Sequence, residues 1–175
     1  MQLETYDYDW NGNRISKVVN DGVSNRSTAY TFDRVDRLLT EMNPDERLED
    51  TLDANGNRTQ RLIKNGAGVL QSTLKYTNNA RDQVLQIETR NAANALMAME
   101  TYQYDAEGNR ISRILAGTTT SYVYDVRGRQ VRAGAVLYEL NDGGVRLAEV
   151  QGSNRTERVF DGLKLKNIKP VMRAD

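Results

Sequence analysis

The chain has 175 residues, with 24 basic and 24 acidic side chains and neither histidine nor cysteine. The missing residue types exclude Ser-His-Asp and Cys-His catalysis, disulfides, and zinc or iron sites built on these ligands. The balanced charge gives no general attraction to nucleic acid or anionic lipid. No apolar run reaches the length of a membrane span, and the N-terminus lacks the apolar region of a signal peptide.

Short strand-like segments alternate along the chain with turn-forming residues. Residues 1–19 predict a first hairpin, and residues 23–32 lead into a second aromatic strand. An apolar content of 38% suits a sheet with one face in water better than a compact globule. Further turns are expected at residues 20–22, 43–46, 64–68, 141–144 and 151–154.

One stretch leaves its secondary structure open. Residues 91–99 are rich in Ala, Leu and Met, which favour a helix. Hairpins are expected on both sides, and these favour a strand, a loop and a second strand instead. Both alternatives stay open at the level of the sequence.

A ten-residue frame recurs and is clearest at residues 102–111. Two tyrosines spaced two residues apart lie on one face of a strand. The Asp-x-x-Gly-Asn segment that follows suits a tight turn, because Asp accepts backbone hydrogen bonds and Gly tolerates positive φ. Aligned on Asp9, Asp33, Asp53, Asn79, Asp105 and Asp125, the six copies are spaced by 24, 20, 26, 26 and 20 residues.

The frame is built from aromatic residues, turn acids, turn glycines and the arginine after the turn. Asp36 stands in the Gly position of the second copy, and Tyr138 is the only one of the nine tyrosines outside the frame. A period of this size indicates an array of supersecondary units. The frame residues are Tyr6, Tyr8, Asp9, Gly12, Arg14, Tyr30, Phe32, Asp33, Asp53, Gly56, Arg58, Tyr76, Tyr102, Tyr104, Asp105, Gly108, Arg110, Tyr122, Tyr124, Asp125 and Gly128.

These residues resemble the YD repeats of the RHS (rearrangement hotspot) family, whose pattern is roughly Tyr-x-Tyr-Asp-x-x-Gly-Arg-Leu. The resemblance covers about residues 4–132 and is close in the first, fifth and sixth copies. It implies an all-β fold in which tandem β-hairpins form a continuous curved, spiralling antiparallel sheet. It also implies part of a hollow shell that encases or displays a toxin or effector cargo in a secreted or surface-exposed protein.

The resemblance also suggests a division of the chain. We expect residues 1–134 to form the YD-repeat array and residues 135–175 to form degenerate hairpin repeats that continue the same sheet. Residues 165–175 look like a fraying, basic terminus. Because the chain starts and stops in repeat-like sequence, we expect it to be a fragment.

The turns offer oxygen atoms at alternating positions, as calcium loops do. An EF-hand loop needs Gly at its sixth position and Glu at its twelfth. In the first copy these positions hold Arg14 and Asn20, and the copies at Asp53 and Asp105 also place an arginine at the sixth. We therefore favour hairpin turns stabilised by an Asp–Arg contact over a cation site, and a calcium-dependent array stays a minor alternative.

The tyrosines and arginines allow two further interpretations. Tyrosine rings on a sheet could stack on sugars, but rings at equivalent positions of neighbouring repeats are also expected to pack against each other. Arginines after the turns could bind phosphate, but the balanced acidic residues favour a solvated face. The alternative function is therefore a carbohydrate-binding adhesion module at a cell surface.

The expected role is structural, with no catalytic residue, cofactor or metal. The self-cleavage site of RHS toxins contains Asp-Pro, whereas Pro44 and Pro170 follow Asn43 and Lys169. Expected partners are the flanking RHS shell, an enclosed cargo domain, a second copy joined through open sheet edges, or glycans. Nucleic acid is not expected as a partner.

Overall fold

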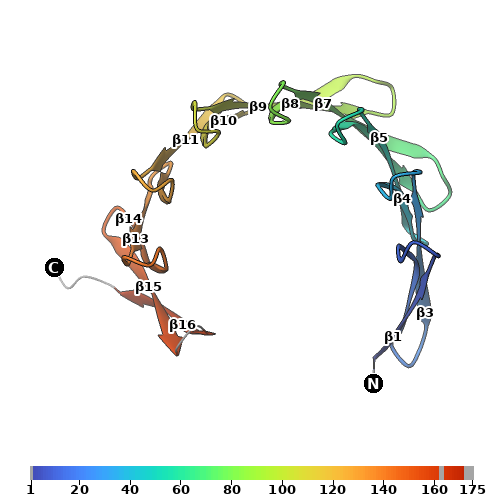
Figure 1. Ribbon diagram of the computed structural model, residues 1–175, viewed down its shortest axis with the longest axis horizontal. Coiled ribbons are helices and arrows are strands. Elements are labelled where there is room, and N and C mark those ends of the chain that lie inside the picture. The colour runs from blue at the N-terminus through green and yellow to red at the C-terminus, as the bar shows by residue number, and fades with distance from the viewer. Residues whose placement is uncertain (1, 162–163, 172–175) are drawn as a thin grey trace. The chain divides into compact units, whose positions relative to one another are not determined.

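The computed structural model describes residues 2–161 and 164–171, with side chains for residues 2–158 (Figure 1). All regular structure in these ranges is β-strand, so they contain no helix that could cross a membrane. The predicted all-β class is confirmed. The strands are β1 (Leu3–Tyr8), β2 (Arg14–Asn20), β3 (Asn25–Phe32), β4 (Leu38–Met42), β5 (Glu46–Leu52), β6 (Arg58–Asn65), β7 (Leu70–Asn78), β8 (Val84–Asn91), β9 (Leu96–Tyr104), β10 (Arg110–Leu115), β11 (Thr118–Tyr124), β12 (Gln130–Ala133), β13 (Val136–Leu140), β14 (Arg146–Gln151), β15 (Asn154–Asp161) and β16 (Lys164–Val171).

Every strand is hydrogen-bonded to the next one along the chain, in the order β1 to β16. The pairing is antiparallel, as expected for tandem hairpins joined by short turns. Among the described strands, β1 has β2 as its single neighbour, through partners that include Thr5 and Val18. The expected array of β-hairpins is therefore confirmed.

The chain divides into two compact units, residues 1–100 and residues 101–175, with the boundary inside β9. The expected end of the YD-repeat array at residue 134 lies between β12 and β13, which pair through Arg132 with Leu137 and Ala133 with Val136. Whether this point divides regular from degenerate repeats stays a prediction.

The helical alternative for residues 91–99 is wrong, because β8 ends at Asn91 and β9 begins at Leu96. The Asn91 side-chain oxygen accepts a hydrogen bond from the Ala95 N–H at 2.9 Å. Asn94, at φ 64°, supplies the left-handed residue that this turn needs, and asparagine tolerates that conformation. Local turn chemistry here outweighs the helix propensity of Ala, Leu and Met.

Very little of the molecule is buried. Among residues 2–158 only Ala148, Thr73 and Ser112 are, as whole residues, less than 9% exposed. The chain exposes 12225 Å², whereas a compact monomer of its 19.8 kDa mass exposes about 8,600 Å². Both faces of the sheet therefore border solvent in the isolated chain, not only the single face expected from composition.

Candidate functional site

The turn of the first copy is folded around the carboxylate of Asp9. The Gly12 N–H donates to the Asp9 carbonyl at 3.1 Å, and the Asp9 N–H donates to the Asn13 carbonyl at 2.9 Å. The Asp9 carboxylate also accepts from the backbone N–H groups of Asn11 at 2.9 Å and Asn13 at 2.8 Å. Gly12 has φ 87°. The result is a three-residue hairpin loop that ends in a left-handed residue.

The same backbone pattern closes the other frame turns. In each, the N–H three residues after the turn acid or amide donates to the carbonyl of that residue. The turn carboxylates accept several N–H donors, which holds the pKa of each below the ordinary aspartate value of 3.8. The largest cause is the side-chain amide of Asn13, Asn57 or Asn109 for Asp9, Asp53 and Asp105, and the backbone N–H of Arg37 or Arg129 for Asp33 and Asp125.

An Asp–Arg contact forms where arginine stands four residues after the turn acid, and not in the copies at Asp9, Asp53 and Asp105, for which it was expected. The Nε atoms of Arg37 and Arg129 lie 2.6 and 2.7 Å from the second carboxylate oxygen of Asp33 and Asp125. In the other aspartate copies an asparagine amide donates to this oxygen at 3.0–3.1 Å, as Asn13 does to Asp9.

The arginine directly after these asparagines stacks on tyrosine. The guanidinium carbon of Arg14 lies 5.4 Å from the centroid of the Tyr6 ring in β1 and 5.0 Å from that of Tyr30 in β3. Arg14 therefore lies between the two rings. From the sequence, these rings were expected to pack directly against each other. Such a cation over an aromatic face is attracted by the ring quadrupole.

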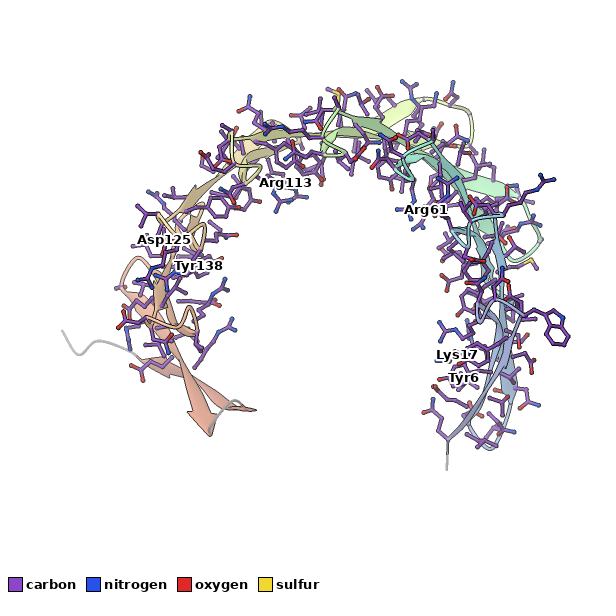
Figure 2. The ribbon with its side chains drawn as sticks, in the orientation of Figure 1. Tyr6, Lys17, Arg61, Arg113, Asp125 and Tyr138 are labelled. Atoms are coloured by element: carbon purple, nitrogen blue, oxygen red, sulfur yellow. The ribbon has the colours of Figure 1, made fainter. Side chains whose placement is uncertain are left out.

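The stacking recurs in the copy at Asp53, where arginine contacts one ring, and in the copy at Asp105, where it contacts two. Figure 2 shows Tyr6 beside Lys17, whose ammonium lies 5.9 Å from the same ring centroid. In each of these copies a cationic side chain lies over a ring face on which a sugar would stack. The corresponding distances are 5.5 Å for Arg110 to Tyr102, 4.7 Å for Arg110 to Tyr122 and 5.6 Å for Arg58 to Tyr76.

A seventh copy of the frame, which the sequence analysis missed, lies in unit 2. The Asn141 N–H donates to the Val145 carbonyl at 3.0 Å, and the Gly144 N–H donates to the Asn141 carbonyl at 2.9 Å. The centroid of the Tyr138 ring lies 3.6 Å from the guanidinium carbon of Arg146. Tyr138 and Arg146 stand three residues before and five residues after Asn141, as Tyr6 and Arg14 do about Asp9. This shared spacing is the sequence signal that identifies the seventh copy.

Hydrogen bonds also join neighbouring turns. The Asp36 carboxylate accepts from the side-chain amides of Asn11 at 2.9 Å and Asn13 at 2.6 Å. Asp36 has φ 62°, a left-handed conformation that costs aspartate more than glycine. The two amide donors explain why aspartate rather than glycine suits this position. We call this arrangement the turn clasp.

A second turn clasp has the same form. Asp82, at φ 61°, accepts from Asn55 at 3.0 Å and Asn57 at 2.6 Å. Between the two clasps, the Arg37 guanidinium donates to the Asp53 carbonyl at 3.0 Å. The frame turns at residues 9–13, 33–37, 53–57 and 79–83 in unit 1 are thus connected one to the next.

The carboxylate of Asp50 is buried, with its side chain 4% exposed. Arg58 and Arg61 lie 2.8 and 2.7 Å from one of its oxygens. Burial raises the pKa of Asp50, but the hydrogen bonds from Arg61 and Arg58 outweigh it and leave the pKa lowered. A carboxylate held ionised between two cations is suited to a structural role and poorly suited to general acid catalysis.

No set of three metal-ligating side chains gathers within residues 2–158. The frame carboxylates are instead surrounded by N–H donors from their own turns. The geometry supports hairpin stabilisation and lateral connection of repeats.

The comparisons with known proteins give sequence relatives but no family assignment. No protein-family model matches the chain. Over 121 residues, 69% of the chain, it is 34% identical to the tRNA3(Ser)-specific nuclease WapA of Bacillus spizizenii and 33% identical to the tRNA nuclease WapA of Bacillus subtilis (strain 168). The matched segment is 4% of each of these proteins.

Solved structures offer weaker likenesses. A crystal structure of TcdB2-TccC3-Cdc42 matches 94% of this chain and 11% of that chain, at 15% identity and a TM-score of 0.37. A porin-like protein from Bacteroides uniformis matches 95% of this chain and 87% of that chain, at 12% identity and a TM-score of 0.43. In sequence, the chain is similar to a short segment of two much longer WapA nucleases.

Proposed function

We propose that this chain is a non-catalytic segment of the repeat shell of an RHS (YD-repeat) protein. The observation that carries the proposal is the lateral connection of the frame turns, in which clasps such as that between Asn13 and Asp36 tie each hairpin to its neighbour. Hairpins that are joined to their neighbours in this way can form the wall of a shell. The similarity to a 4% segment of the WapA nucleases agrees with such a part of a longer protein.

The exposed surface supports a role that involves a protein partner. The chain exposes 12225 Å², about 3,600 Å² more than a compact monomer of this mass would. A protein interface of ordinary size buries about 800 Å² on each partner, so this surface leaves room for a protein partner. The partners that fit are the adjoining shell and an enclosed or displayed toxin or effector domain.

The open edge at β1 is a second place for a protein partner. All six of its residues, Leu3–Tyr8, are exposed. An unpaired strand edge presents backbone donors and acceptors that can pair with another strand. We therefore include self-association of this chain through its sheet edge in the proposal.

Catalysis lies outside the proposed role. The name nuclease belongs to the WapA relatives, and this chain corresponds to 4% of each. It contains no histidine or cysteine, and its frame carboxylates already accept hydrogen bonds from their turns. In this role the chain uses no cofactor or metal and does not bind nucleic acid. By family resemblance, the whole protein is secreted or displayed at the cell surface.

Carbohydrate binding is the alternative function, and it remains a prediction. Stacking on sugars needs accessible ring faces. Arginine or lysine lies over the rings of Tyr6, Tyr30, Tyr76, Tyr102 and Tyr122. This arrangement favours the scaffold role.

The test is the light-scattering mass of the chain across protein concentrations, with and without EDTA, together with a glycan array. We expect the mass to rise with concentration, no effect of EDTA, and no saturable glycan binding. Replacing Leu3 and Thr5 by lysine should reduce assembly, because lysine on an edge strand opposes pairing. The control is Val23→Lys in the exposed β2–β3 turn. A monomer at all concentrations or saturable binding of a glycan would contradict the proposal.

A further inference from the structure

The turn clasps follow a rule of position. In each clasp the donors stand two and four residues after the turn acid, and the acceptor stands three residues after the first residue of the next frame turn. Both clasps have asparagine as donors and aspartate as acceptor. The first joins Asn11 and Asn13 to Asp36, and the second joins Asn55 and Asn57 to Asp82.

The third pair of turns, residues 105–109 and 125–129 in unit 2, departs from this rule. The clasp positions hold Glu107, Asn109 and Gly128. Gly128 has φ 71°, close to the backbone of Asp36, but it brings no carboxylate. Asn109 donates to Asp105 of its own turn at 3.0 Å, and within the described residues no hydrogen bond links Glu107 or Asn109 to the turn 125–129.

A hollow of about 500 Å³ lies between these two turns. This is within the range of about 300–1,000 Å³ that is usual for binding pockets. Ile111, Val123 and Val126 give it apolar walls, and they are 37%, 45% and 105% exposed. Tyr122 and Tyr124 also line the hollow.

The charged residues that line the hollow are all acidic. Asp105, Glu107 and Asp125 line it, and neither lysine nor arginine does. Arg127 and Arg129 donate to the Asp142 carbonyl of the next turn at 3.1 and 3.2 Å. Arg129 also pairs with Asp125 at 2.7 Å, and the guanidinium carbon of Arg110 lies 4.7 Å from the centroid of the Tyr122 ring.

Among the three acids, Glu107 is the one available to a ligand. The Asp105 carboxylate accepts the N–H of Asn109 at 2.7 Å and its amide at 3.0 Å. The Asp125 carboxylate is held by the N–H and Nε of Arg129. The Glu107 side chain, which is exposed, makes no hydrogen bond or ion pair among the described residues.

We propose that this hollow binds a lysine or arginine side chain from an extended segment of a protein partner. Its aliphatic stem packs against Ile111 and Val123, and its cationic end pairs with Glu107. Long basic side chains combine an apolar stem with a charged head in this way, and the hollow offers both surfaces. A simple metal ion fits less well, because it would meet apolar walls and a single free carboxylate. This site goes beyond the scaffold role, which requires no recognition of a particular side chain.

The test is an NMR titration of the ¹⁵N-labelled full chain with the blocked peptide Ac-Gly-Val-Lys-Val-Gly-NH₂. We expect saturable shifts of the backbone amides of Ile111, Val123 and Val126. The matched peptide with glutamate in place of lysine should bind at least tenfold more weakly. Equal binding of the two peptides, or no saturable shift with the lysine peptide, would overturn the proposal.

Two variants locate the site. Glu107→Gln keeps the size of the side chain and should weaken binding of the lysine peptide about tenfold, whereas Glu46→Gln, the same change on an exposed residue of unit 1, should leave it unchanged. The double variant Glu107→Asn with Gly128→Asp installs the donor and acceptor of a clasp. It should close the hollow and abolish binding without lowering the thermal transition. Undiminished binding by the double variant would also contradict the proposal.

Discussion

The Asp36 carboxylate accepts a hydrogen bond from the Asn13 side-chain amide, with 2.6 Å between Oδ1 and Nδ2, although the two residues are 23 positions apart in the chain. Asp36 holds φ 62°, where glycine would be less strained. The left-handed backbone of Asp36 is therefore a local conformational cost, and the hydrogen bond that connects two repeats offsets it. The contact also makes the clasp the clearest place to test how the array is held together.

We expect Asp36→Gly to destabilise unit 1, although glycine suits the backbone better. The lost hydrogen bonds from Asn11 and Asn13 outweigh the relieved strain, for a net loss of about 1 kcal/mol. Urea denaturation followed by circular dichroism measures this loss. In a double-mutant cycle, Asn11→Ala should add little once Asp36 is replaced, because the Asn11 side-chain amide donates to Asp36. A stabilised Asp36→Gly variant would show that backbone strain dominates at this position.

The hairpin array could be predicted from the sequence, because each frame turn depends on residues close together in the chain. Asp9 accepts its backbone donors from Asn11 and Asn13, so the local pattern already contains the turn. The same logic explains the failure at residues 91–99, where composition suggested a helix and Asn91 with Asn94 formed a turn. The seventh copy escaped notice because Asn141 replaces the acid and follows Asp125 by only 16 residues.

Contacts between repeats could not be predicted in the same way. The place of Arg14 between Tyr6 and Tyr30 depends on the register of three strands. Tyr8 pairs with Arg14 while Asp7 pairs with Ser16, so an extra residue, Ile15, interrupts the register after the turn. Bulges of this kind redirect side chains. The candidate hollow beside Glu107 depends likewise on which residues two successive turns bring together.

The stacking of Arg14 gives a second prediction. Arg14→Ala should lower the stability of unit 1 by about 1 kcal/mol, because its guanidinium contacts two rings. The control is Arg34→Ala, which removes the same charge from an exposed turn position. Thermal unfolding followed by tyrosine fluorescence compares the two. Equal effects of the two substitutions would assign the loss to net charge rather than to stacking.

The turn aspartates predict that the fold is sensitive to acid. Their pKa values are lowered in the folded chain by accepted hydrogen bonds. A lowered folded pKa contributes stability that is present above the unfolded pKa and is lost as pH falls through the folded pKa. The thermal midpoint should therefore stay level down to about pH 5 and fall below about pH 4, near the unfolded aspartate pKa.

Replacing turn aspartates by asparagine checks the origin of this acid sensitivity. Asparagine keeps one oxygen acceptor but does not titrate in this range. A variant with Asp9, Asp33 and Asp53 changed to Asn should be less stable near pH 7 and should lose less stability on acidification than the unchanged chain. Thermal midpoints measured from pH 3 to pH 7 give both quantities. Parallel pH curves for the two proteins would rule out these carboxylates as the source.

The final prediction concerns Gly66, in the turn between β6 and β7. A Cβ atom at this position would overlap the carbonyl oxygen of Pro44 and lie 2.7 Å from its carbonyl carbon. Since the obstacle is backbone rather than a flexible side chain, one of the two turns must move. Gly66→Ala should therefore cost about 1–3 kcal/mol, as overpacking usually does.

The control for this change is Gly143→Ala, where the added Cβ would lie 3.4 Å from the Asn141 side-chain oxygen, which can adjust. We expect that variant to unfold within about 0.5 kcal/mol of the unchanged chain, as substitutions without a structural conflict usually do. Urea denaturation of the three proteins provides the comparison. If Gly66→Ala were as stable as Gly143→Ala, the close approach of the turns at residues 43–46 and 65–69 would not exist in solution.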